Sequence, residues 1–204
     1  MNSYSLSDGE RLVKAARQAI ELRIISPHFR REMVERLLEG FDEERGVFVT
    51  IEHYPTRELR GCIGFPRAAD PLKKSLVDAA IAAATEDPRF VPVSHQEFEH
   101  MLIEVSVLTD PEPIVARDEE QIKKAIKIGR DGLIIESGYN GGLLLPIVAI
   151  EQGWGKKEFL ENLCLKAGLP PYYWKNPKIK LQKFSCQIFK EISPSGKVQE
   201  IVLD

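Results

Sequence analysis

Apolar residues recur at helical spacing in the first part of the chain. Leu12, Ala16 and Ile20 stand four positions apart, which places them on one face of a helix. Ser7 and Glu10 precede them with the three-residue spacing of a capping box, so we expect this helix to begin at Ser7. The dipeptide Ser26-Pro27 predicts the end of the helix.

An alternating pattern of apolar and polar residues then predicts a β-hairpin. Residues 47–52 are rich in β-branched side chains and alternate, as strands do, and residues 58–65 form the expected returning strand. The intervening residues 54–56 read Tyr-Pro-Thr, a sequence typical of a turn. We therefore expect the two strands to pair antiparallel.

The hydrophobic pattern also suggests how the two strands are aligned. Pairing His53 with Arg57 gives the hairpin one coherent apolar face. In that register Thr50 lies opposite Arg60, and Arg60 and Cys62 project together from the other face. The register therefore predicts a guanidinium and a thiol side by side.

Further helices and short strands follow the hairpin. An alanine-rich helix is predicted after Asp70-Pro71, with Asp70 as its N-cap, and its small side chains favour close packing on a sheet. Residues 110–113, which include two prolines, should end the strand over 102–108. The other predicted elements are a surface helix or ordered loop over 30–45, strands over 102–108, 133–135, 143–145 and 181–192, and helices over 118–127 and 156–167.

This order of elements favours an α+β fold. Hairpins are mixed with separate helices and there is no regular βαβ alternation, so we expect an antiparallel sheet flanked by helices. We expect the whole chain, 1–204, to form one unit of two packed subdomains of unequal size. The larger subdomain should comprise about 1–68 with 128–204, and the smaller one about 69–127.

Composition narrows the class of protein. Against 28 Lys and Arg there are 31 Asp and Glu, so no global basic field favours nucleic acid or an anionic membrane. The longest apolar run, 143–150, is too short for a transmembrane helix. The N-terminal residues lack the pattern of a signal peptide. We therefore expect a soluble, cytoplasmic protein that does not bind a membrane.

Cysteine and histidine spacing predicts neither a disulfide framework nor a metal site. The three cysteines, Cys62, Cys164 and Cys186, are far apart and form no CxxC, so we expect reduced thiols. The four histidines show no HxH or HxxxH spacing. Nucleotide-binding and hydrolase motifs are absent as well, and we expect no cofactor.

The stretch 59–66 is the strongest candidate for chemistry. Gly61 and Gly64 interrupt a strand, as glycines do at a bulge or where a ligand or another backbone approaches closely. A guanidinium at Arg60 would stabilise the thiolate of Cys62 and bind a carboxylate or phosphate. In the alternative interpretation, Cys62 is a small buried residue and Arg60 pairs with Glu52 or Glu58.

Other polar positions are weaker candidates. Asp87 and Arg89 flank a proline, and Arg89 offers a second anion contact that Asp87 would orient. A helix-ending turn with a local ion pair explains them equally well. Glu104 and Ser106 share one face of a strand and line either a cleft or a solvated surface.

Aromatic and basic residues gather at 172–183. Tyr172, Tyr173 and Trp174 precede four lysines, a combination that grips single-stranded nucleic acid in some proteins. A loop whose aromatic rings pack on the core, with solvated lysines, is the alternative. The acidic total disfavours nucleic acid. The four lysines are Lys175, Lys178, Lys180 and Lys183.

Several short segments in order resemble the AMMECR-one family. Together they span about residues 5–192, nearly the whole chain. Ile147 is a departure, since glutamine is expected there after Leu-Pro. The matching segments are GVFVT (46–50), LRGCIG (59–64), DPRF (87–90), EVSVL (104–108), GLII (132–135), LP (145–146), EQGW (151–154) and KAG (166–168).

The resemblance implies an α+β fold of two unequal subdomains and no settled activity. It also implies an association with Memo-like and radical SAM proteins. We hold three functions open: a substrate-handling or enzyme-like domain for a small anionic molecule, a non-catalytic interaction module for such partner proteins, and nucleic-acid binding through Lys175–Lys183. No reaction class is indicated. In the first, Cys62 is the catalytic group, and Arg60, Gly61, Gly64, Asp87 and Arg89 bind the substrate.

Overall fold

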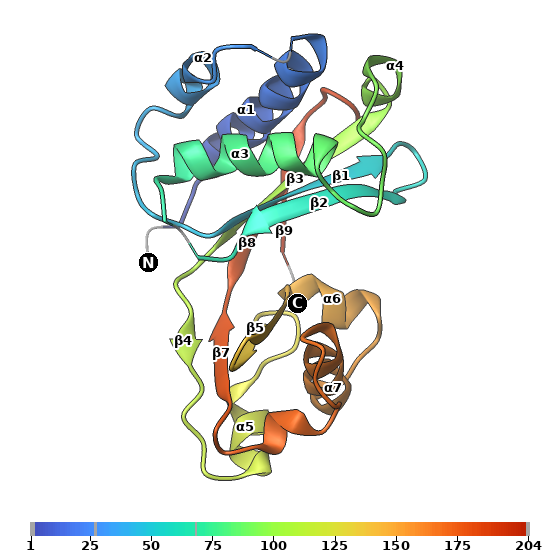
Figure 1. The fold of residues 1–204 in the computed structure, drawn as a ribbon. Coiled ribbons are helices and arrows are strands. Elements are labelled where there is room, and N and C mark those ends of the chain that lie inside the picture. Colours follow the sequence, from blue (N-terminus) through green and yellow to red (C-terminus); the bar gives the residue numbers. More distant parts are fainter. Residues whose placement is uncertain (1–2, 27, 68, 203–204) are drawn as a thin grey trace. The chain divides into compact units, whose positions relative to one another are not determined.

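The computed structural model describes residues 3–26, 28–67 and 69–202, and the fold is α+β with antiparallel sheets flanked by helices, as expected. The chain divides into two compact units (Figure 1). The first contains the residues up to Leu108 together with Gln187–Val202, and the second contains Thr109–Cys186. The expected division at 69 and 127 differs from this one, because the helix after residue 70 packs on the hairpin that precedes it.

The first unit is built on a five-stranded sheet in the order β2-β1-β3-β8-β9. β2 and β9 are its edges, and the central strand β3 is buried along nearly its whole length. The strands are β1 (Val47–His53), β2 (Leu59–Phe65), β3 (Met101–Leu108), β8 (Cys186–Glu191) and β9 (Val198–Ile201).

Helices cover one face of this sheet. α1 packs on β3, β9 and α3, and α3 packs on β1 and β2 (Figure 1). The apolar sides of these helices and strands form one core, which includes Leu12, Val49 and Leu76. The helices are α1 (Leu6–Ile25), α2 (Glu32–Glu35), the 3₁₀ turn η1 (Arg36–Leu38), α3 (Leu72–Thr85) and α4 (His95–Phe98).

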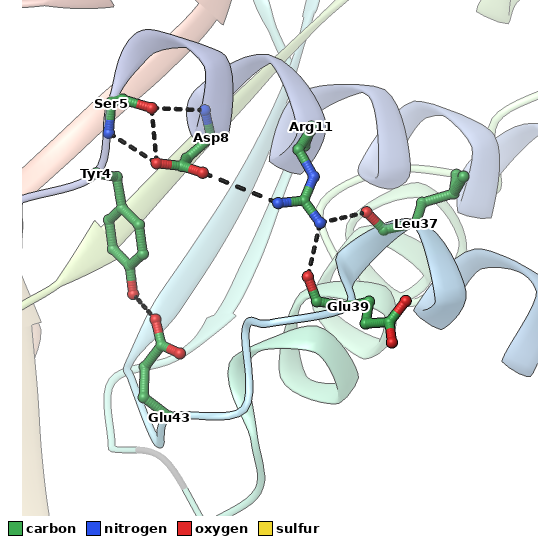
Figure 2. Close-up of polar contacts among 7 residues, drawn as sticks. All are labelled: Tyr4, Ser5, Asp8, Arg11, Leu37, Glu39 and Glu43. Atoms are coloured by element: carbon green, nitrogen blue, oxygen red, sulfur yellow. Dashed lines mark hydrogen bonds and ion pairs between the residues drawn. The ribbon is translucent and has the colours of Figure 1, made fainter.

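The start of α1 lies two residues before the expected one. Ser5, not Ser7, is the N-cap: its hydroxyl accepts from the amide of Asp8 at 3.2 Å, and the Asp8 carboxylate accepts from the amide of Ser5 at 2.9 Å. Figure 2 shows this capping box beside Arg11, whose guanidinium donates to two backbone carbonyls of the following segment. Tyr4 donates to Glu43 in the same view. These contacts join the first turn of α1 to residues 37–43.

The hairpin pairs in a register two residues from the expected one. Thr50 lies opposite Cys62, not Arg60, so that prediction is wrong. The ladder shifts between Ile51 and Glu52, which makes Arg60 the extra residue of a β-bulge. A bulge turns the extra side chain away from strict alternation. Arg60 and Cys62 therefore do not follow the same strand face.

The second unit has its own four-stranded sheet, in the order β4-β7-β5-β6, and its own core. Phe159, Leu160 and Trp174 are among the fully buried residues of that core. The strands are β4 (Glu112–Pro113), β5 (Gly132–Ser137), β6 (Asn140–Leu144) and β7 (Lys180–Phe184). The helices are α5 (Glu119–Ala125), α6 (Pro146–Glu151), α7 (Lys156–Lys166) and the 3₁₀ turn η2 (Tyr173–Lys175).

Two expected elements differ in detail, and two short helices were not expected. The single last strand over 181–192 is two strands, β7 and β8, which are separated at Ser185 and belong to different sheets. Pro71 is the N-cap of α3, while the Asp70 carboxylate pairs with Lys74. The short helices α4 and α6 were not expected, because each spans only four to six residues and gives little periodic signal.

Candidate functional site

The two glycines of β2 allow protein to pack closely on protein. A Cβ on Gly61 would overlap the carbonyl oxygen of Ala83, so α3 lies directly against β2 at this point. A Cβ on Gly64 would overlap the carbonyl oxygen of Val47 and the ring of Phe48. The glycines thus fix the strand against its neighbours, and their expected contact with a ligand stays a prediction.

Cys62 lies on an edge strand, and its outward backbone groups bond to two side chains. The Cys62 amide donates to Oδ2 of Asp87 at 2.8 Å, and Nη2 of Arg89 donates to the Cys62 carbonyl at 3.5 Å. Both residues lie just beyond the end of α3. This pair occupies the place that a neighbouring strand would take, and it blocks the open edge of β2.

The Asp87 carboxylate is buried, and each of its two oxygens accepts two hydrogen bonds. It accepts from the Arg89 amide, Nε and Nη2 at 3.1, 2.9 and 2.7 Å, besides the Cys62 amide. The hydrogen bonds from Arg89, more than any other contact, lower the pKa of Asp87 to about 2. Asp87 therefore stays ionised and holds Arg89 in one orientation next to Cys62.

The Arg89 side chain is 53% exposed despite this anchoring. Within the residues that the structure describes, no hydrogen bond uses Nη1 of Arg89. The pKa of Arg89 is raised, chiefly by its hydrogen bonds with Asp87 and further by the nearby Cys62 side chain. A guanidinium with two N–H groups facing outward thus lies within electrostatic range of the thiol.

Arg60 is bonded within the protein. Its Nε donates to Oε1 of Glu97 at 2.6 Å, and its Nη2 donates to the Val91 carbonyl at 2.8 Å. Its guanidinium lies 5.6 Å from the centre of the Phe90 ring, and the residue is 6% exposed. The hydrogen bond from Arg60 lowers the pKa of Glu97. The predicted neighbours of Arg60 in the alternative interpretation, Glu52 and Glu58, are not its partners in these contacts.

A row of polar side chains crosses three strands of the sheet. Thr50 on β1 is paired with Cys62 on β2 and with Glu104 on β3, so the three side chains share one face. The Thr50 hydroxyl donates to the Cys62 sulfur at 3.4 Å. Gly61 faces α3, so its neighbour Cys62 projects from the face opposite that helix.

Lys190 on β8 extends this row. Its ammonium lies 2.6 Å from Oε1 of Glu52 and 3.1 Å from Oε2 of Glu104, and all three side chains are about 85% buried. Burial opposes the charge of Lys190, but the two carboxylates outweigh burial and raise its pKa. Oε2 of Glu52 is buried and has no hydrogen-bond partner among residues 3–26, 28–67 and 69–202.

Lys190 and Glu97 were missed from the sequence. Lys190 stands two residues after Ile188 and so on the same face of the strand, and a charged residue in line with an apolar one was the available signal for it. Glu97 carried no such signal, because it stands in a one-turn helix 37 residues from its partner Arg60.

The 172–183 segment of the second unit does not form one solvated basic stripe. Trp174 is 1% exposed and belongs to the core, whereas Tyr172 is 64% exposed. Lys175 pairs with Glu119 at 2.9 Å, and Lys183 donates to the last carbonyl of α5 at 3.2 Å. Nucleic-acid binding and partner binding through this segment stay predictions.

The described part of the chain lacks two features, a metal-binding cluster and a membrane-spanning helix. No group of three or more His, Cys, Asp or Glu side chains there is arranged to hold a metal ion. Within the same ranges, no helix combines the length and the apolar character that crossing a membrane requires.

Comparison with known proteins identifies a family. The family model described as AMMECR1 matches residues 13–189. A protein of Methanocaldococcus jannaschii is 46% identical over 200 residues, which cover 98% of each chain. One from Thermococcus gammatolerans is 48% identical over 206 residues, covering 96% of this chain and 97% of its own. The crystal structure of an uncharacterized protein from Pyrococcus horikoshii matches with a TM-score of 0.90 and 43% identity, covering 97% of this chain and 98% of its own.

Proposed function

Because the chain belongs to the AMMECR1 family, for which these comparisons state no activity, we propose a function from the geometry around Cys62. The first unit is a substrate-handling domain that binds a small anionic compound. Arg89 contacts the anionic group, and the Cys62 thiol faces the bound compound. The cytoplasm, which is favoured by three cysteines that form no disulfide, is part of this proposal.

One observation carries the proposal: Asp87 bonds the Cys62 amide and the Arg89 guanidinium at the same time. A single buried carboxylate thereby fixes the half-exposed cation relative to the thiol. Guanidinium groups bind carboxylates and phosphates through paired N–H donors, and Nη1 of Arg89 makes no hydrogen bond with the described residues. A nearby cation also favours the thiolate of a cysteine.

The remaining signature residues support this site indirectly. Arg60 is a positioning residue, since its bonds to Glu97 and Val91 hold the bulge of β2 in place. Gly61 and Gly64 let the strand pack against α3 and β1. Cys62 and Arg89 are therefore the two side chains that we expect to touch the compound.

Charge-selective labelling of Cys62 tests the proposal. The native protein is treated with two methanethiosulfonates, one with an anionic sulfonatoethyl group and one with a neutral methyl group. Mass spectrometry gives the rate at each cysteine. We expect the anionic reagent to be favoured at Cys62, relative to a free thiol in solution. Arg89→Gln should reduce that preference about fivefold, which corresponds to roughly 1 kcal/mol of charge interaction near the surface.

The second unit offers a matched control. Arg130 pairs with Asp131 through the same two nitrogens and is 54% exposed, but it is remote in sequence from the Cys62 site. Arg130→Gln should leave the preference at Cys62 unchanged. Equal preference in the Arg89→Gln protein and the unaltered protein would contradict the proposal, as would a Cys62 that reacts only after unfolding.

A further inference from the structure

The most unusual charges in the first unit lie on the sheet face that carries Cys62. Lys190 is held between Glu52 and Glu104, and this triad is about 85% buried. Removing three charged groups from water is unfavourable unless hydrogen bonds and ion pairs compensate fully. Here the hydrogen bonding is incomplete within the described residues, because one carboxylate oxygen of Glu52 lacks a donor there.

The incomplete compensation is located at one atom. Oε1 of Glu52 accepts from Lys190, but the buried Oε2 accepts from no residue in the described ranges. A buried carboxylate oxygen without a donor is unfavourable, so native proteins rarely keep one unless something else binds it. The group that satisfies this oxygen must supply an N–H or O–H donor, and a cationic donor forms a stronger hydrogen bond with a carboxylate than a neutral one does.

The triad and the thiol belong to one continuous row. Cys62, Thr50 and Glu104 are cross-strand neighbours on β2, β1 and β3, and Glu52 follows Thr50 by two residues on the same face. Glu52 lies one strand over and two residues along from Cys62, and at about 4.8 Å per strand and about 3.3 Å per residue this is roughly 8 Å between their Cα positions. A single small molecule can therefore reach from the thiol to the carboxylates.

We infer that Glu52 binds an ammonium or similar cationic N–H group of the same compound that Arg89 and Cys62 bind. The compound is then zwitterionic, with its anionic group beside Arg89 and its cationic group at Glu52. Lys190 contacts both carboxylates and fixes their orientation. This inference rests on the proposed function, because it names the class of compound that the Cys62 site takes.

A length series of cationic thiol reagents tests the inference on the unaltered protein. The probes are aminoethyl, aminobutyl and aminohexyl methanethiosulfonate, each compared with the uncharged alkyl reagent of equal length. We expect the amine to accelerate labelling of Cys62 at least fivefold over its alkyl partner for the aminohexyl reagent, whose chain spans about the distance to the carboxylates. The aminoethyl reagent is too short to reach Glu52 and should show a smaller acceleration.

Two variants locate the effect. Glu52→Gln keeps an oxygen for Lys190 but removes the negative charge, and it should abolish the acceleration by the long amine. Glu58→Gln is the control, since Glu58 is an exposed carboxylate of the same hairpin. If Glu52→Gln fails to fold, the length series alone decides. An acceleration that does not depend on reagent length overturns the inference, and so does one that survives Glu52→Gln.

The outcomes separate the inference from the proposed function. A preference for anionic reagents that needs Arg89, without any effect of the long amine, supports the proposed function and overturns the zwitterionic class. An amine effect that needs Glu52, without any effect of Arg89, supports a cation site and contradicts the anionic one. A native Cys62 that no reagent labels overturns both.

Discussion

Gly61 is the residue at which the hairpin and α3 approach most closely. A methyl group at this position would overlap the Ala83 carbonyl, which belongs to a helix backbone and cannot rotate away. We expect Gly61→Ala to lower the free energy of unfolding by about 1–3 kcal/mol, the usual effect of overpacking. Urea titration followed by circular dichroism measures this change.

Gly141 provides the comparison for Gly61→Ala. It also lies in a strand, but a methyl group there would meet only a carbonyl oxygen at 3.8 Å, an ordinary contact. Gly141→Ala should therefore change the stability by much less. Equal effects of the two substitutions would show that close packing against α3 is not the reason for a glycine at 61.

The sequence indicates that the strand around Cys62 is irregular, but it does not indicate which residues contact that strand. Glycines inside a strand correctly predict a bulge and a close backbone approach. The register could not be predicted, because a shift of two residues leaves every side chain on its own face and the hydrophobic pattern unchanged. The partner of Arg60 could not be predicted either, since Glu97 stands 37 residues away.

At the scale of elements, the first turn of α1 shows how two similar signals compete. Ser5 with Asp8 and Ser7 with Glu10 both have capping-box spacing, and the helix uses the first pair. Ser7 is an exposed residue of the first turn. Spacing alone cannot separate the two, because either serine can accept from an amide three residues later.

Paired substitutions distinguish the two serines. Ser5→Ala removes the acceptor of the Asp8 amide and should lower stability by about 1 kcal/mol. Ser7→Ala exchanges one exposed helical residue for a better helix former and should be neutral or slightly stabilising. Thermal unfolding of both variants checks this. A larger loss for Ser7→Ala than for Ser5→Ala would contradict the observed cap.

The last strand shows a second limit of reading elements from sequence. Residues 181–192 mix apolar and polar side chains and contain no glycine or proline, which predicts one strand. The structure divides it at Ser185 between two sheets. Periodicity reports which residues are buried, and both halves are buried, but it does not report which sheet covers them.

At the scale of the whole molecule, two separate cores have formed. No residue of the core around Leu12 and Val49 belongs to the core around Phe159 and Trp174. The expected boundaries placed α3 in the smaller subdomain, within residues 69–127. Its alanines instead pack on the preceding hairpin, and no composition shift in the sequence marks that contact.

The placement of tryptophan makes the two cores separately observable. Both tryptophans of the chain, Trp154 and Trp174, pack in the second unit. We expect tryptophan fluorescence to follow unfolding of the second unit alone, while far-ultraviolet circular dichroism follows both. The two urea curves should therefore not coincide. Superimposable curves would instead indicate that the cores unfold in a single cooperative step.

The contact between Thr109 and Ser185 has a topological consequence. The Thr109 amide donates to the Ser185 carbonyl at 2.8 Å, and the Ser185 amide donates to the Thr109 hydroxyl at 2.9 Å. These residues follow β3 and precede β8, which are neighbours in the sheet. The second unit is thus an insertion in the loop of a hairpin. The chain enters it at Thr109 and leaves it at Ser185, and these two residues are hydrogen-bonded to each other. Evolution can lengthen, exchange or shorten such an insertion without altering the connectivity of the sheet that carries Cys62.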